Sequence, residues 1–177
     1  LHPSAASKYA DEHGRPPTSG REQGMVKLMS SILLKRLESS VYAFEITLGK
    51  IIEVIRHNLK VIEDYRAGAS GASVEGVESF EYEEGDTDFT VGTKSRFSLE
   101  DMDWISWERD MLKDLEALED IRQLIAPIDA EHDAKLAELR RVIADKVENP
   151  INPGNKKLLI FTAFADTADY LYENIGA

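Results

Sequence analysis

The chain has 177 residues, of which 42% are hydrophobic, with no cysteine and a net charge of −12. This length allows one domain of ordinary size, and the lack of cysteine excludes a disulfide framework and zinc–thiolate sites. No apolar run approaches the roughly 20 residues of a membrane span, and residues 1–24 lack the basic start and apolar middle of a signal peptide. These features favour a cytoplasmic protein with no membrane partner.

Charge is spread unevenly along the chain. Basic minus acidic residues give +2 for residues 1–67, −11 for residues 68–126 and −3 for residues 127–177. The overall acidity argues against contact with nucleic-acid phosphates, which attract basic surfaces. Because the first third is mildly basic, the asymmetry leaves nucleic acid open as a partner of that part.

The first predicted elements are an arm and a long helix. Residues 1–24 are rich in Ser, Gly, Pro and charge, which predicts a flexible linker or arm. From Met25 to about Ala67, apolar residues recur at steps of three and four, which predicts one helix covered on two sides. Such a helix would be roughly 60 Å long, so we expect a bend or break at Gly49. Its stripe consists of Val26, Met29, Leu33, Leu37, Val41, Phe44, Leu48, Ile51, Ile55, Leu59 and Ile62.

An acidic, glycine-rich segment follows at residues 68–98. It holds five glycines and seven acidic residues with little apolar periodicity, which predicts a long mobile loop. An acidic mimic of nucleic acid or a regulatory lid would give this loop a function. A solvated insertion explains the same composition, and we expect that simpler alternative.

Two more helices are predicted after this loop. Ser98 followed by Asp101 makes a capping box, and a helical stripe begins beyond it. Pro127 ends that helix, and Asp129 is the predicted cap of the next one, which runs to the turn at residues 148–155. We expect the two helices to form a hairpin and, together with the long helix, a small antiparallel bundle.

The last predicted unit is a buried strand followed by a helix. Leu158–Phe161 is an apolar run bounded by a turn rich in Pro, Gly and Asn, and helical periodicity follows it. A parallel strand needs neighbours, which a crossover of a dozen or more residues separates from it. The expected fold class is therefore mainly α, with one C-terminal strand–helix unit of an incomplete α/β lobe at residues 150–177. We expect the chain to be a piece of a larger protein.

Motifs for catalysis are not found in the sequence. There is no Gly-x-x-x-x-Gly-Lys-[Ser/Thr] phosphate loop, no Gly-x-Ser-x-Gly nucleophile elbow and no Gly-x-Gly-x-x-Gly. An acidic cluster surrounds one histidine and consists of Asp129, Glu131, His132 and Asp133. A metal hydrolase that uses His132 is therefore one hypothesis for the function. Helical spacing would point residues 131–133 in different directions, however, so we expect no metal site and no catalytic residue here.

Two segments resemble a known family. Leu33–Phe44 (LLKRLESSVYAF) is similar to the segment that follows the first motor lobe in bacterial Snf-type helicases of superfamily 2, the DEAD/DEAH class. Leu158–Leu171 (LLIFTAFADTADYL) resembles the first strand and helix of their second RecA-like lobe, the region called motif IV. Both occur in the family's order. Walker A, the DEAD/DEAH box and the arginine-bearing motif VI are absent, so this piece should not hydrolyse ATP alone.

The resemblance implies an organisation and a function. Residues 25–149 would be a helical domain between the two RecA-like lobes of an ATP-dependent DNA helicase or translocase, and residues 150–177 would open the second lobe. The parent protein would bind ATP and Mg, while this piece is expected to bind no cofactor. Its partners would be DNA and the remaining lobes.

The resemblance also suggests residues that contact nucleic acid. Thr162 and Phe164 would lie at the top of the second lobe's first strand, where Thr162 either bonds a phosphate or caps the following helix. Lys35 and Arg36 belong to a series of basic residues along the long helix. That series either tracks DNA phosphates or forms ion pairs with interleaved glutamates on a solvated face.

A rival hypothesis comes from another class of protein. The chain would then be a stand-alone helical module for protein interaction or dimerisation, with no motor attached. Leu158–Phe161, lacking sheet neighbours, would pair edge to edge with another copy and form a homodimer.

Overall fold

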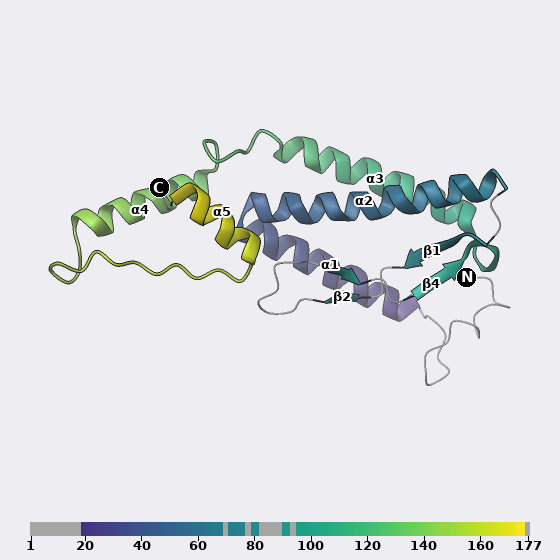
Figure 1. Ribbon diagram of the computed structural model, residues 1–177, viewed down its shortest axis with the longest axis horizontal. Coiled ribbons are helices and arrows are strands. Elements are labelled where there is room, and N and C mark those ends of the chain that lie inside the picture. The colour runs from purple at the N-terminus through teal and green to yellow at the C-terminus, as the bar shows by residue number, and fades with distance from the viewer. Residues whose placement is uncertain (1–18, 69–70, 77–78, 82–89, 93–94, 176–177) are drawn as a thin grey trace.

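The computed structural model describes residues 19–68, 71–76, 79–81, 90–92 and 95–175. Within these ranges the chain is mainly helical, as the sequence predicts, and the molecule is elongated (Figure 1). None of the described helices combines the length and the hydropathy that crossing a bilayer requires. The helices are α1 (Ser19–Ser39), α2 (Val41–Arg66), α3 (Trp104–Ile125), α4 (Ala134–Glu148) and α5 (Ala165–Ile175), with a short 3-10 turn, η2 (Leu99–Asp101).

The predicted arm is helical in part. α1 begins at Ser19, so residues 19–24, which composition assigns to a linker, belong to the helix. Each glycine in a helix interior costs only about 1 kcal/mol relative to alanine, so the glycines there do not prevent a helix that the following stripe extends. The rest of the predicted arm, residues 1–18, lies outside the described residues.

The long predicted helix breaks at Ser40 rather than at Gly49. Ser40 is extended, with φ −157° and ψ 150°, and its Oγ accepts a hydrogen bond from the amide of Ala43 at 3.0 Å. Serine is a preferred N-cap because its oxygen pairs with an amide that the first helical turn leaves open. Gly49 lies inside the uninterrupted α2, so the prediction of a bend there is wrong.

α1 and α2 form a V that opens from Ser40 (Figure 1). Leu33 of α1 packs on a cluster of buried α2 residues, and α3 covers the same cluster from another side with Leu115, Leu118 and Ile125. The two-sided cover predicted for the long helix is therefore confirmed for α2. The buried members of this cluster are Phe44, Leu48 and Ile52.

α3 runs antiparallel to α2. Its first turns pack at the end of α2, where Ile62, Leu99 and Met111 are buried together, and its last turns reach the start of α2. Trp104 and Trp107 border the Ile62 cluster and are part of the core. The helix starts later than the capping box at Ser98 predicts, because Asp103 caps it through a bond from the Ser106 amide at 3.2 Å.

The acidic segment between α2 and α3 contains strands, which corrects the prediction of a loop. β1 (Ser73–Gly76) pairs antiparallel with β4 (Ser95–Ser98), and β2 (Ser79–Glu81) pairs with β3 (Thr90–Gly92). The ladders share one register, because Val74 faces Phe97 and, six residues further along, Phe80 faces Val91. We call the two ladders the ribbon. Residues 82–89, which hold several of the acidic groups, lie outside the described residues.

α4 does not form the predicted hairpin with α3. It continues away from the α2–α3 pair and projects beyond their ends (Figure 1). Pro127 follows the end of α3 as predicted, but Asp133 rather than Asp129 caps α4, accepting bonds from the amides of Lys135 and Leu136 at 2.9 and 3.0 Å. Because Asp133 lies four positions after Asp129, α4 starts about one turn later than a cap at Asp129 would give.

The predicted strand at Leu158–Phe161 belongs to no β-ladder in the described part of the chain. After α4 the chain turns back and runs as an extended segment to α5, which begins at Ala165 as the periodicity predicts. The segment lies apart from the α2–α3 pair, while α5 packs near the point of the V (Figure 1). The helix of the predicted strand–helix unit is thus confirmed, whereas its strand has no sheet here.

The α2 core gives the first testable prediction. We expect Leu48→Ala to lower the free energy of unfolding by about 2–5 kcal/mol, because Leu48 is 0% exposed and its loss leaves a cavity between three helices. The matched control is Leu124→Ala on α3, where the side chain is 77% exposed and the change should stay within about 0.5 kcal/mol. Urea unfolding measures both, and equal losses in the two variants would contradict the packing described.

Candidate functional site

Four of the six buried polar side chains of the described residues, Arg36, Ser40, Asp133 and Thr167, lie where α1, α2, α4 and α5 meet. α1 ends here, while α2, α4 and α5 begin here, so side chains from four elements converge at the point of the V. Long-range hydrogen bonds and one buried ion pair connect them. We call this set the corner, and it consists of Arg36, Ser39, Ser40, Asp133, Lys135, Asp166, Thr167 and Tyr170.

An ion pair joins α1 to α5. Nη1 of Arg36 lies 2.5 Å from Oδ2 of Asp166, and the Arg36 side chain also stacks over the Phe164 ring, 4.9 Å from its centroid. Arg36 is only 5% exposed, so its charge is taken out of water and Asp166 compensates it at close range. The same Nη1 also donates to the carbonyl of Ala43 at 3.5 Å.

Three hydroxyl groups join the break in the long helix to α5. Oγ1 of Thr167 lies 2.8 Å from Oγ of Ser39 and 3.0 Å from Oγ of Ser40. Ser40 thereby makes two bonds with one oxygen, since the same Oγ caps α2 through Ala43. α5 is held against the very residues at which α1 ends and α2 begins.

Tyr170 joins α5 to α4. Its hydroxyl donates a hydrogen bond to Oδ2 of Asp133 at 3.0 Å, and its ring stacks on Tyr42 with centroids 5.1 Å apart. Burial, together with the neighbouring Asp133 carboxylate, raises the pKa of Tyr170 to about 12. Asp133 therefore uses one oxygen to cap α4 and the other to hold α5.

Lys135 ties the start of α4 to the end of α1. Its Nζ donates hydrogen bonds to the carbonyl oxygens of Glu38 and Ser39, the latter at 3.0 Å. The last carbonyls of a helix have no partner within the helix, and a cation near them also complements the helix dipole. The corner thus satisfies both helix ends that the break at Ser40 creates.

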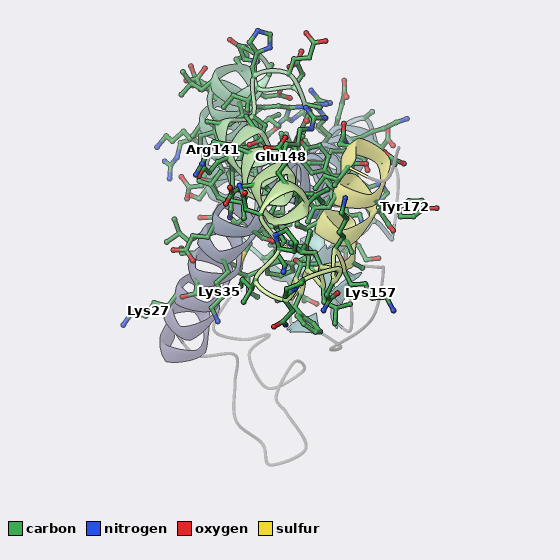
Figure 2. All side chains as sticks on the ribbon, turned by 90° about the vertical axis from the view of Figure 1, so that its left-hand side faces the viewer. Lys27, Lys35, Arg141, Glu148, Lys157 and Tyr172 are labelled. Carbon is green, nitrogen blue, oxygen red and sulfur yellow. The ribbon has the colours of Figure 1, made fainter. Side chains whose placement is uncertain are left out.

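The predicted nucleic-acid residues lie in different environments. Arg36, Thr162 and Phe164 come together at the corner: Phe164 is 8% exposed, and Oγ1 of Thr162 lies 3.4 Å from Oγ of Ser39. Lys35 is exposed on α1 (Figure 2). Thr162 also accepts a bond from the Phe164 amide at 3.3 Å, which makes a local turn just before α5 and supports its alternative interpretation as a residue that shapes the helix start.

The other basic residues of the long helix are partly paired across to α3. Arg56 lies 2.5 Å from Oε1 of Glu119, and Arg66 pairs with Glu108. The sequence predicts two alternative roles for these basic residues, contact with DNA phosphates and ion pairs with glutamates of the same helix. Neither role predicts ion pairs with α3. Because they lie at the surface, each is worth about 0–1 kcal/mol and mainly fixes the alignment of α2 and α3.

The acidic cluster near His132 forms a turn. Oδ1 of Asp129 accepts bonds from the amides of Glu131 and His132 and lies 2.7 Å from Nδ1 of His132, which lowers the pKa of Asp129. No group of three or more His, Asp or Glu side chains suited to a metal ion occurs among the described residues.

A groove of about 520 Å³ opens beside the corner, between α4, α5 and residues 160–163. Asp133 and Thr167 at its base are already hydrogen-bonded within the corner. Its wall is largely apolar, so the groove suits a segment of protein better than a charged substrate. The apolar side chains of that wall are Leu136, Leu139, Val142, Ile160, Phe161 and Leu171.

The extended segment beside the groove has the side-chain alternation of a strand. Leu158 and Ile160 are 38% and 42% exposed, whereas Leu159 and Phe161 are 83% and 90% exposed. Successive side chains therefore point to opposite sides, as in a pleated strand. The segment has apolar groups on both sides, but its backbone belongs to no ladder in the described residues.

Sequence reasoning missed most residues of the corner. The resemblance gave Arg36, Thr162 and Phe164, but Ser39, Ser40, Thr167 and Tyr170 carried no motif. A signal for Ser40 did exist, because serine is both a preferred N-cap and a poor residue for a helix interior. The arrangement as a whole joins four helices through side-chain hydrogen bonds and an ion pair.

The corner predicts a dependence of stability on pH. The pKa of Tyr170 rises from its ordinary value of 10.0 to about 12 on folding, so its contribution is complete below pH 10 and is lost as the pH rises toward 12. Urea unfolding between pH 8 and pH 12 measures this loss. In Tyr170→Phe we expect stability to be lower by about 1–3 kcal/mol at pH 8, because Asp133 loses its donor, and this part of the pH dependence to vanish.

Tyr172→Phe is the matched control, since Tyr172 follows on the same helix but is 80% exposed and projects outward (Figure 2). It should keep both the stability at pH 8 and the alkaline loss of the unsubstituted chain. If Tyr170→Phe and Tyr172→Phe behave alike, the bond from Tyr170 to Asp133 contributes nothing.

Comparisons with known proteins add no relative to this picture. No protein-family model matches the chain, no curated protein is similar to it, and no solved structure matches it. The resemblance to Snf-type helicases therefore depends on the two segments quoted for it, Leu33–Phe44 and Leu158–Leu171. Six of the eight corner residues lie in these two segments, which their bonds bring into contact, whereas Asp133 and Lys135 lie outside both segments.

Proposed function

We propose that this chain is the helical region between the two RecA-like lobes of an ATP-dependent DNA helicase or translocase, followed by the start of the second lobe. It is not catalytic alone, and ATP and Mg belong to the parent motor. The observation that carries the proposal is that Leu158–Phe161 has the conformation of a strand without a neighbouring strand in the described residues. The segment is extended, alternates like a strand and has apolar side chains on both sides, yet it pairs with no strand among the residues that the structure describes.

The two apolar sides of this segment indicate which kind of sheet it fits. A strand of an antiparallel sheet with one wet face alternates apolar and polar residues, whereas a strand of a parallel sheet is covered by helices on both faces. Leu159 and Phe161 therefore need a cover of their own, opposite the α4 side. A RecA-like lobe supplies such a sheet, with this segment as its first strand and α5 as the following helix.

The corner supplies the coupling that a region between two lobes requires. α5, which would belong to the second lobe, is fixed to the end of α1 and the start of α2 by an ion pair and shared hydroxyl groups. A rotation of the second lobe would therefore act directly on the V of α1 and α2. The two segments that resemble the family are the two halves of this joint.

A role in DNA binding follows as part of the same proposal. Lys35 is exposed on α1 and available to a phosphate, whereas Arg36 and Phe164 are buried and would act by positioning their neighbours. Thr162 is bonded at the corner, so a phosphate contact by its hydroxyl requires that bond to open. Lys35 is thus the first residue to test.

The test of this proposal is binding of duplex DNA to the chain as a function of salt. We expect log K to fall linearly with log salt, and Lys35→Ala to reduce the slope by about 0.9, the value of one phosphate contact. Lys113→Ala on the exposed face of α3 should leave affinity and slope unchanged, because that face is acidic. A slope near zero, or equal effects of the two substitutions, would remove DNA contact from the proposal.

A second candidate function is dimerisation by a stand-alone helical module. It is favoured by the same exposed pair, Leu159 and Phe161, because an unpaired apolar strand invites a second copy. Two copies pairing antiparallel through Leu158–Phe161 would form a closed, symmetric interface. In the full reading frame, a phosphate loop upstream and an arginine-bearing motif downstream would favour the motor, and their absence would favour this module.

The dimer is tested by light scattering over a range of concentrations. We expect the mass of two chains at high concentration, and the mass of one chain for Phe161→Glu, because a charge at that position prevents apolar pairing. Leu124→Glu is the matched control, since Leu124 is similarly exposed but belongs to α3, a helix that lies apart from the extended segment in Figure 1. A mass of one chain at all concentrations counts against the module.

A further inference from the structure

The break between α1 and α2 is unusual because the sequence does not require it. The apolar stripe runs through it without a change of period, from Leu33 and Leu37 to Val41, Phe44 and Leu48, and neither glycine nor proline lies at the junction. A local sequence that fits one continuous helix is folded into two helices. Something outside the helix must therefore hold the bend.

We propose that the Ser40 junction is a two-state element: α5 and α4 docked at the corner hold α1 and α2 bent, and their release allows the two helices to join into one straight helix. This inference goes beyond the proposed function and requires neither ATP nor DNA. It concerns the shape of the chain itself.

The backbone hydrogen bonds show how close the two states are. Helix-type bonds already reach the junction from both sides, from the Ser40 amide to the Arg36 carbonyl at 2.9 Å and from the Phe44 amide to the Ser40 carbonyl at 3.2 Å. A continuous helix would need in addition only the bonds from the amides of residues 41, 42 and 43 to the carbonyls of residues 37, 38 and 39. Rotation of the single extended residue, Ser40, is what forms them.

The corner supplies substitutes for these helix bonds. The amide of Ala43 bonds Oγ of Ser40 instead of the carbonyl of Ser39. The carbonyls of Glu38 and Ser39 accept bonds from Lys135 at the start of α4. These two carbonyls have Lys135 as a partner only while α4 stays in place, whereas the cap of the Ala43 amide lies within the junction itself.

α5 makes the other contacts that hold the bend, and we call these contacts the clamp. Thr167 bonds both serines at the junction, and Asp166 pairs with Arg36 one turn before it. In a straight helix Ser40 would rotate away from Thr167, so these contacts favour the bent state alone. A contact that exists in one state only is what shifts an equilibrium between two states.

The two states also differ in packing. The bent state buries Leu33 against the α2 cluster of Phe44, Leu48 and Ile52, and the straight state loses this contact. The straight state gains three helix hydrogen bonds and releases Ser40 from its extended conformation. Each state therefore has favourable interactions that the other lacks. We infer that the docking of α5 is enough to decide which state is populated.

The test measures the distance between α1 and α2. The chain has no cysteine, so spin labels on Lys27→Cys and Lys60→Cys mark two exposed helix positions without interference. In a straight helix the labels would lie about 50 Å apart, at 1.5 Å per residue, and in the V they lie closer together. We expect the short distance in the unsubstituted background.

Two sets of substitutions shift the states in opposite directions. Ser40→Ala with Thr167→Val removes the cap and the clamp, and we expect the distance to lengthen to about 50 Å while helical circular dichroism is kept or rises. Val41→Pro is the matched control, because proline suits the first position of a helix but cannot lie inside one. It should keep the short distance, even when combined with Thr167→Val.

Asp166→Asn provides an independent variant that leaves the junction itself unchanged. It weakens only the pair with Arg36, and we expect it to increase the fraction of molecules at the long distance. If the double variant loses its helical signal, Asp166→Asn decides the matter. A folded double variant or a folded Asp166→Asn variant that keeps the short distance overturns the proposal.

Discussion

The side-chain oxygen of Ser40 decides the architecture of this chain. By accepting the amide of Ala43 it ends one helix and starts the next, and the direction of everything around α2 follows from that change. The bend at this cap places Leu33 against the cluster that α3 also covers. The cap acts together with the contacts that α4 and α5 make at the same junction.

The attachment of α5 to this V differs in kind from the packing of α2 on α3. The α2–α3 pair is held by buried aliphatic and aromatic side chains, which stabilise but tolerate rearrangement. The corner depends on a buried ion pair and on hydroxyl groups with fixed directions. A buried ion pair contributes little net stability, but it penalises every arrangement that separates its charges, so it favours one position of α5 over others.

The sequence predicts the helices well and their junctions poorly. Helical periods extend over many residues, so a single misread position does not hide them, and α2, α3, α4 and α5 lie close to where the stripes place them. Junctions depend on one or two residues. Ser40 lies within an apolar stripe that continues without a break, so the stripe does not indicate the helix end there. Both Asp129 and Asp133 are suitable caps for α4, and periodicity does not distinguish them. The strands of the ribbon lie in an acidic, glycine-rich segment whose composition is typical of a loop. The corner is built from those junctions, and for this reason sequence patterns single out only two of its members, Arg36 as a DNA contact and Asp133 in the acidic cluster.

The ribbon is inserted between α2 and α3, and the two chain segments that lead into it and out of it are joined by a hydrogen bond where they meet the helices. The amide of Leu99 donates to the carbonyl of Ala72 at 3.2 Å, so the chain leaves and re-enters the helical core at one place. Because β1 still packs against α2, additions or deletions beyond β1 and β4 are those that change the length of the two-stranded appendage without touching the helices. Evolution can therefore lengthen, shorten or exchange this part as a cassette, while selection on the helices proceeds separately.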